Sequence, residues 1–207
     1  HPWQEIKEGT RFVFGHALLL PVFVTQLVFN TAFFILQAVY VPYAAQKLGL
    51  GAASIGATLA TYGVGMVLGA LFAPRLARLV PFGTIIGIGP VCGLAAALAM
   101  LGTIWLPSVW LAGLSFFLIG VGPVLWVIST TTLRQSVTPS DMLGRVSAIS
   151  LLATGARPLG AAIGAAIGSV YGTEACLFVA AAGFLIQAMV ILVSPVVRLA
   201  RQPAMAA

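Results

Sequence analysis

The chain has 207 residues, of which 60% are hydrophobic and only 7% are charged, and its formal net charge is +6. Soluble domains carry roughly 25% charged residues, so this chain cannot cover a water-facing surface, and we expect the lipid bilayer to be its first partner. The basic residues are scattered singly or in pairs along the sequence. Because no basic patch is present, nucleic acid is not an expected partner.

Residues 1–16 differ from the rest of the chain because apolar and charged residues alternate. Trp3, Ile6, Phe12 and Phe14 are interspersed with Glu5, Lys7, Glu8 and Arg11. This pattern predicts an amphipathic helix on the membrane surface, and a disordered leader is the alternative. The first residue is His1 rather than Met, so we expect the chain to be a piece of a longer protein or a trimmed one.

Six apolar runs follow, each close to the roughly 20 residues that cross a bilayer. They are Ala17–Val41, Ala53–Phe72, Thr84–Trp105, Val109–Ile128, Val146–Tyr171 and Ala175–Val197. Short gaps rich in turn residues separate them. The sequence therefore predicts an all-α integral membrane protein with a six-helix transmembrane domain over residues 17–198 and a cytoplasmic tail over residues 199–207.

The basic residues outside the apolar runs divide unequally between the two predicted sides of the membrane. One side receives only Lys47, and the other receives eight residues, which are Lys7, Arg11, Arg75, Arg78, Arg134, Arg145, Arg198 and Arg201. Lys and Arg collect in cytoplasmic loops. We therefore expect both ends of the chain to be cytoplasmic.

The first run carries three amides, Gln26, Asn30 and Gln37, on one narrow face. At roughly 100° per residue they fall within about 40° of one another on a helix. Amides do not face lipid, because their polar groups would go unpaired there. We interpret them as the polar wall of a substrate pathway, with hydrogen bonding between helices as the alternative. Tyr40 and Tyr43, near the outer end, are expected to be membrane-interface anchors.

Arg157 is the one basic residue inside an apolar run, and Pro158 follows it. Proline cannot donate to the carbonyl of Thr154, so the helix is expected to be open there. Arg157 lies about 15 Å from the predicted cytoplasmic edge. It is either an anion-binding or gating cation that faces a cavity or a partner domain, or a structural residue that caps the freed carbonyl and reaches toward the headgroups.

Small residues recur at every fourth position in two of the runs. Gly160, Gly164 and Gly168 form one such stripe, and Gly65 and Gly69 form a shorter one. These stripes predict close helix packing.

The fourth run contains the segment Gly120–Pro123, which predicts a kink or weak point. Trp126 follows it, either as a pathway residue or as an interface anchor.

Residues for catalysis are lacking in the apolar runs. The four acids are Glu5, Glu8, Asp141 and Glu174, and all lie outside the runs or at their edge. Neither histidine pairs with a nucleophile, and Cys92 and Cys176 have no metal-binding spacing. We therefore expect no enzyme activity, no cofactor and no metal. No acid inside a run is available to carry a proton.

Four segments resemble a known family. Gly69–Arg78 is similar to a loop of the major facilitator superfamily, with Arg78 where the family carries an acid. Thr132–Val146 resembles the loop before the eleventh helix in bacterial members of the enterobactin-exporter branch, and Gly155–Gly160 and Glu8–Phe12 resemble that branch too. The resemblance covers nearly the whole chain, but only helices seven to twelve of a twelve-helix transporter.

The resemblance implies the C-terminal half of a transporter in the bacterial inner membrane. Such a transporter would be a proton-coupled antiporter that exports a small amphiphilic molecule, such as a drug or siderophore, by rocking two halves around a midplane site. The missing N-terminal half would then supply the proton-carrying acid. The alternatives are a half-size membrane protein acting as a homodimer or scaffold, and an inactive fragment.

The resemblance also implies roles for individual residues. The first and fourth spans would line the substrate cavity, through Gln26, Asn30, Gln37 and Trp126. The second and fifth spans would pack against the missing half, with gating or interface residues Gly65, Gly69, Arg157, Pro158, Gly160, Gly164 and Gly168. The basic residues of the cytoplasmic loops would be Arg75, Arg78, Arg134 and Arg145.

Overall fold

The computed structural model describes residues 2–204 and, within them, the side chains of residues 4–204. The elements in chain order are α1 (Pro2–Gly15), α2 (Leu19–Gln46), α3 (Ala52–Leu79), α4 (Phe82–Gly102), α5 (Val109–Val137), α6 (Leu143–Thr154), α7 (Ala156–Tyr171), α8 (Thr173–Val193) and the 3₁₀ helix η1 (Pro195–Arg198). In this part of the chain six segments are long and apolar enough to cross a membrane, with α6 and α7 together forming the fifth. The predicted all-α six-helix membrane architecture is confirmed.

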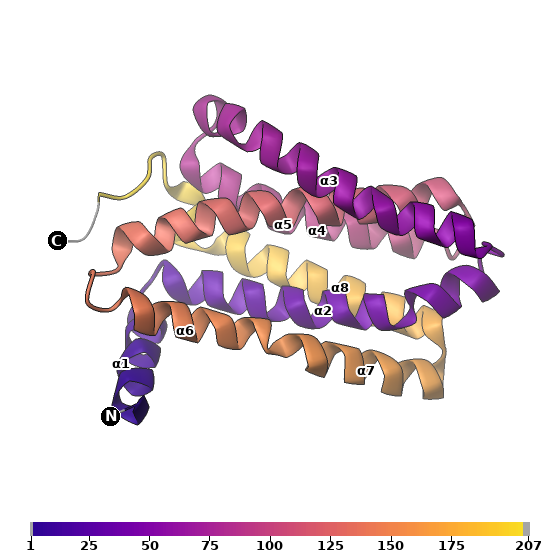
Figure 1. The fold of residues 1–207 in the computed structure, drawn as a ribbon, viewed down its shortest axis with the longest axis horizontal. Coiled ribbons are helices and arrows are strands. Elements are labelled where there is room, and N and C mark those ends of the chain that lie inside the picture. The colour runs from indigo at the N-terminus through magenta and orange to yellow at the C-terminus, as the bar shows by residue number, and fades with distance from the viewer. Residues whose placement is uncertain (1, 205–207) are drawn as a thin grey trace.

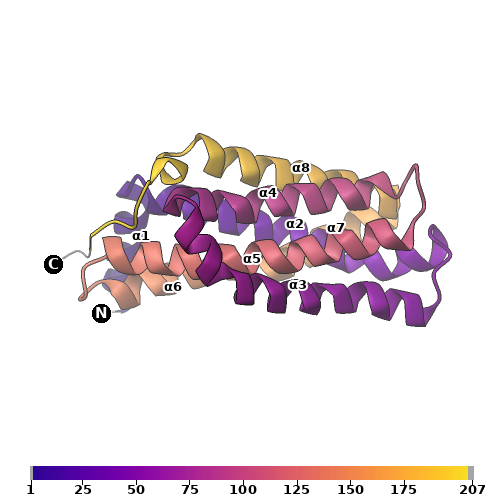
Figure 2. The ribbon, with the colours of Figure 1, turned by 90° about the horizontal axis from the view of Figure 1, so that it is seen from above.

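The six candidate membrane spans run lengthwise, each antiparallel to the next in the chain, and α1 lies across one end of the bundle (Figure 1). We call the end that carries α1 and η1 the terminal end, and the opposite end, where α2 leads into α3 and α7 into α8, the distal end. The first and last described residues, 2 and 204, therefore lie at the same end of the bundle. The ends of α3 and α5 and the start of α6 also lie there (Figures 1 and 2).

Several helices extend beyond the apolar runs that predicted them. The runs ended at Val41, Phe72 and Ile128, whereas α2, α3 and α5 continue to Gln46, Leu79 and Val137. Apolar composition marks the depth of the hydrocarbon, but a helix satisfies its own backbone and can continue into the headgroup region. Pro42 and Pro74 lie inside the extensions without ending the helices.

Helix α1 forms where the amphipathic segment was predicted, and it packs against α6 at the terminal end (Figure 1). Val13 is buried and clusters with Leu19, Val146 and Ile149. An ion pair joins Arg145 to Glu8 at 3.0 Å. The helix is thus attached to the bundle by its apolar face, and its position on a membrane surface stays a prediction. The side chain of Trp3 lies outside the described residues.

Glycines set the closest helix contacts, and these contacts lie within this bundle. A Cβ on Gly65 would lie 2.3 Å from the carbonyl oxygen of Phe117 in α5, and one on Gly160 would lie 2.4 Å from that of Thr31 in α2. The stripe of Gly160, Gly164 and Gly168 therefore packs α7 on α2, and the pair Gly65 and Gly69 packs α3 on α5. The predicted close packing is present. The prediction that the glycine stripes pack against a missing half is wrong, because the backbone at each stripe contacts a neighbouring helix of the same chain.

The segment Gly120–Pro123 also takes part in close packing. Helix α5 continues through this segment without interruption. A Cβ on Gly120 would lie 2.2 Å from the carbonyl oxygen of Tyr62, and one on Gly122 would lie 2.8 Å from that of Gly89. These two glycines let α3 and α4 approach α5 from two sides.

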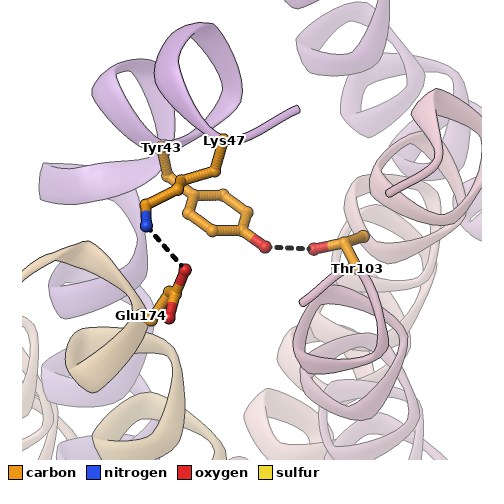
Figure 3. A network of polar contacts seen from close by, with 4 residues as sticks. All are labelled: Tyr43, Lys47, Thr103 and Glu174. Atoms are coloured by element: carbon orange, nitrogen blue, oxygen red, sulfur yellow. Dashed lines mark hydrogen bonds and ion pairs between the residues drawn. The ribbon is translucent and has the colours of Figure 1, made fainter. Parts of the chain in front are cut away.

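The distal end is closed by buried polar contacts (Figure 3). Tyr40 and Tyr43 are each 1% exposed, so their prediction as interface anchors is wrong. The Tyr43 hydroxyl is hydrogen-bonded to Thr103 Oγ1 at 2.8 Å. The Tyr40 hydroxyl is hydrogen-bonded to Thr58. A tyrosine hydroxyl needs a partner when buried, and Thr58 in α3 and Thr103 in the turn after α4 supply it. Sequence periodicity could not show these partners.

Beside Tyr43, Lys47 forms an ion pair with Glu174 at 3.0 Å, which links the end of α2 to the start of α8 (Figure 3). The basic residue that the sequence isolated on one side therefore has an acidic neighbour there.

The C-terminal segment is attached to the terminal end. The backbone N–H of Gly83 donates to the carbonyl oxygen of Leu199 at 2.8 Å. Gln202 Nε2 donates to Ser136 Oγ at 2.8 Å, which ties the segment to α5. The tail predicted over residues 199–207 is therefore held against the bundle in its described part, and residues 205–207 lie outside the described residues.

Candidate functional site

A cavity of about 770 Å³ lies among the helices, bounded mainly by α2, α5, α6 and the start of α7. Gln37 and Tyr62 line it at mid-bundle, and Arg134 and Ser147 line it toward the terminal end. The first and fourth apolar runs, which became α2 and α5, thus supply two of its walls.

The four residues predicted for a substrate pathway, Gln26, Asn30, Gln37 and Trp126, all line this cavity. Gln37 is exposed, whereas Asn30 and Trp126 are 5% and 8% exposed. The structure thus brings the amide stripe of α2 and the indole of α5 to one space. That these residues form a substrate pathway stays a prediction.

The amides of α2 also form hydrogen bonds, two of which reach α6. Gln26 Nε2 lies 3.5 Å from both the carbonyl oxygen of Ser150 and Thr154 Oγ1. Asn30 Nδ2 donates to the carbonyl oxygen of Gln26 at 2.8 Å. Hydrogen bonding and cavity lining, which the sequence left as alternatives, therefore occur together in the same side chains.

Arg157 enters the cavity beside the break between two helices. Helix α6 ends at Thr154 and α7 begins at Ala156, so Pro158 falls in the first turn of α7, where proline is tolerated. Arg157 Nε donates to Asn30 Oδ1 at 3.0 Å. Its guanidinium carbon lies 5.6 Å from the centre of the Phe34 ring, within cation–π range.

The contacts of Arg157 distinguish between the two roles that the sequence left open for it, an anion-binding or gating cation and a structural cap. Its hydrogen bond goes to an amide of α2, so its prediction as a cap for the freed carbonyl is wrong. The side chain is exposed and lines the cavity. The free-energy cost of placing this charge in an open cavity is lower than that of burying it.

Arg134 is a cavity residue that sequence reasoning assigned to a loop. It lies in the last turn of α5, and its Nε is buried without a hydrogen-bond partner within the described residues. A helix longer than its apolar run carried this side chain into the cavity. No signal in composition marked that extension.

Gln187 is a second lining residue that sequence reasoning missed. It is 1% exposed, and its Nε2 donates to the carbonyl oxygen of Pro90 at 3.0 Å. A single amide within the sixth apolar run was the available signal.

The remaining basic residues predicted for loops lie away from the cavity. Arg75 and Arg78 border a separate hollow beside Phe72, and the Arg75 guanidinium lies 5.8 Å from the centre of that ring. Arg145 is paired with Glu8. These residues do not share a site with Arg157.

No acid from the described residues lines the cavity. Glu8 and Glu174 are paired elsewhere. Among the described residues no group of three or more His, Cys, Asp or Glu side chains is placed to hold a metal ion. The chemistry of the cavity therefore comes from amides, hydroxyls, aromatic rings and two guanidinium groups.

Comparison with known proteins gives a match in structure. No family model matches the sequence, and no curated protein does. A solved structure of a mutant of the peptide transporter POT in complex with alafosfalin is similar, with a TM-score of 0.70 at 21% sequence identity. The match covers 94% of this chain and 42% of that chain. The fold is therefore that of one half of a major facilitator-type transporter, and the chain spans less than half the length of the structure it matches.

Proposed function

We propose that this chain is the C-terminal half of a secondary transporter of the enterobactin-exporter branch. The complete transporter exports a small amphiphilic molecule such as a drug or siderophore. The observation that carries the proposal is the amide-lined cavity in half of a major facilitator-type fold. Gln26, Asn30 and Gln37 give it polar groups, and Phe33 and Trp126 give it apolar surface. Sites for small molecules combine these two kinds of lining.

The mechanism we propose is alternating access. A second six-helix half covers the cavity, and the two halves rock around it. The efflux is driven by protons as an antiport. Because no carboxylate of the described residues lines the cavity, the acid that carries the proton belongs to the second half.

The proposed location is the bacterial inner membrane, with both termini in the cytoplasm. Two observations support this orientation. Residues 2 and 204 lie at the same end of the bundle (Figure 1). Eight of the nine basic residues outside the apolar runs belong to loops and helix ends on that side. Such an excess is typical of the cytoplasmic face.

The test is an efflux assay on the complete protein, read from the coding frame upstream of His1. Cells that lack their main efflux pumps express it, and accumulation of ethidium and of carboxyfluorescein is followed with and without a protonophore. We expect reduced accumulation of at least one dye and loss of that effect on adding the protonophore. Equal accumulation of both dyes with and without the protein would contradict the proposal.

A matched pair of variants links the efflux to the cavity. Gln37→Leu removes an amide from the lining, and Gln46→Leu makes the same change in α2 outside it. We expect only Gln37→Leu to reduce efflux.

The purified 207-residue chain, reconstituted alone, is expected to transport neither dye. Transport by the chain alone would favour a homodimer instead.

A further inference from the structure

The cavity carries positive charge that no acidic side chain of the described residues compensates. Arg157 and Arg134 both line it, and no carboxylate of the described residues does. Of the acids, Glu8 and Glu174 are engaged with Arg145 and Lys47, at opposite ends of the bundle. Arg157 is exposed and Arg134 is half-buried, and each attracts an opposite charge that enters the cavity. The uncompensated pair of guanidinium groups therefore favours a negatively charged occupant.

Arg157 is held in a way that leaves most of its donors available. Its Nε–H is donated to Asn30 Oδ1 at 3.0 Å, and within residues 2–204 neither terminal nitrogen makes a hydrogen bond or ion pair. A guanidinium has five N–H donors, so four remain. Asn30 is itself oriented by its bond to the Gln26 carbonyl. The arginine is thus positioned by α2 and presents its fork to the cavity.

Arg134 supplies a second unfilled donor. Its Nε is buried and has no hydrogen-bond partner among the described residues. A buried donor without a partner costs free energy. Arg134 also lines the cavity, so its positive charge adds to that of Arg157 there.

The remaining lining suits the aromatic body of a ligand. Phe29, Phe34, Tyr62 and Trp126 line the same cavity. Phe34 lies against the Arg157 guanidinium, 5.6 Å from ring centre to carbon. An aromatic ring and an anionic group joined in one molecule would match both kinds of surface.

We propose that the cavity binds organic anions, with a carboxylate, sulfonate or phosphate group on Arg157 and an aromatic body against the rings. This inference rests on the proposed function, since it names the substrate class of the same site. The required anionic group is what distinguishes it from a cavity for neutral or cationic amphiphiles.

The test compares two fluorescent probes that differ by one sulfonate. These are 1-anilinonaphthalene-8-sulfonate, an anion, and N-phenyl-1-naphthylamine, its neutral counterpart. The purified full chain is placed in phosphatidylcholine nanodiscs, and saturable fluorescence above that of empty nanodiscs is measured. We expect the anionic probe to bind at least roughly tenfold more tightly than the neutral one, as one hydrogen bond to a charged group would provide.

Three variants identify the source of the preference. Arg157→Gln removes the charge and is expected to weaken the anionic probe roughly tenfold, with the neutral probe unchanged. Asn30→Asp is nearly isosteric and places a carboxylate against Arg157, so it is expected to remove the preference too. Arg198→Gln removes the same charge from the exposed end of η1 and is expected to have no effect.

Each other outcome overturns the proposal. Equal affinity for the two probes, no saturable binding of the anionic probe, or an unchanged preference in both Arg157→Gln and Asn30→Asp would do so. Retained binding of the neutral probe shows that a variant is folded. This assay measures binding without transport. Anion binding by a protein that transports no dye would therefore contradict the proposed function while supporting the anion site.

Discussion

The distal end and the cavity show how polar side chains within one bundle can serve different purposes. At the distal end, Tyr40 and Tyr43 are buried and their hydroxyls are hydrogen-bonded to Thr58 and Thr103. In the cavity, Gln37 is exposed and Arg157 retains unused donors. Polar groups that are fully paired hold helices together, whereas polar groups left partly unpaired are available to a ligand. Substitutions at the distal end should therefore cost stability, and those in the cavity should cost binding.

The largest effect is expected from Tyr40→Ala. Removing this buried ring leaves a void beside Phe116, whose ring centre lies 4.5 Å away. Loss of a buried aromatic side chain costs about 3 kcal/mol. The free energy of unfolding in mixed micelles should fall by that amount, with anionic-probe binding unchanged in the folded fraction. An effect on stability below that of Tyr43→Phe would contradict the closed character of this end.

Gly65→Ala should be next, at about 2 kcal/mol. Its added Cβ would meet the carbonyl oxygen of Phe117 at 2.3 Å, so α3 and α5 must move apart. Gly63→Ala is the matched control, because nothing lies within 4 Å of a Cβ there and alanine favours a helix. Thermal unfolding of the two variants should shift in opposite directions. A similar shift in both would show that the contact does not set the helix spacing.

Tyr43→Phe should destabilise the chain by about 1 kcal/mol, the usual net contribution of one hydrogen bond. The ring stays, and only the bond to Thr103 at 2.8 Å is lost (Figure 3). A double-mutant cycle with Thr103→Val measures the coupling. Additive effects of the two substitutions would mean that the hydroxyls do not interact.

Gln37→Ala should change the free energy of unfolding by less than about 0.5 kcal/mol. The side chain is exposed to the cavity, and no hydrogen bond of its amide is present within the described residues. Chemical unfolding alongside Tyr40→Ala tests the contrast directly. A loss comparable to that of Tyr43→Phe would give Gln37 a structural role.

The smallest effect concerns pH at the junction of α1 and α2, outside the spanning helices. Burial lowers the pKa of the His16 imidazole below its ordinary value of 6.5, and its Nδ1 accepts the backbone N–H of Leu18 at 3.2 Å. When the α1–α2 junction is unpacked, His16 binds a proton more readily than when it is packed. The packed junction is therefore destabilised as pH falls below 6.5, and its stability does not change with His16 protonation above that pH. Amide hydrogen exchange at Leu18 should accelerate below that pH. His16→Asn should remove the pH dependence, and its persistence would assign it to another group.

Most of the fold could be predicted from the sequence. Twenty-residue apolar runs have few alternatives in a bilayer, and the regular alternation of basic residues separates the spans cleanly. The helix ends were less accessible, because α5 continues to Val137, nine residues past the apolar run that ended at Ile128. That extension is what brings Arg134 to the cavity.

The site was predictable where helical periodicity applies. Gln26, Asn30 and Gln37 share a face by spacing alone, and the structure places them in one cavity. The partner of Arg157 was not predictable, because Asn30 lies 127 positions away in the chain. The burial of Tyr43 was likewise hidden, since its partner Thr103 lies in the turn after another helix.

The sequence by itself determined that the chain has six segments able to cross a membrane, because charge and unpaired polar groups are costly in hydrocarbon wherever they occur. That cost depends on local composition and needs no knowledge of neighbours. Only the tertiary structure decided which glycine meets which helix, which tyrosines are buried, and that Arg157 is held by Asn30 beside Phe34. These outcomes depend on contacts between distant segments, and such contacts leave no periodic trace in a single sequence.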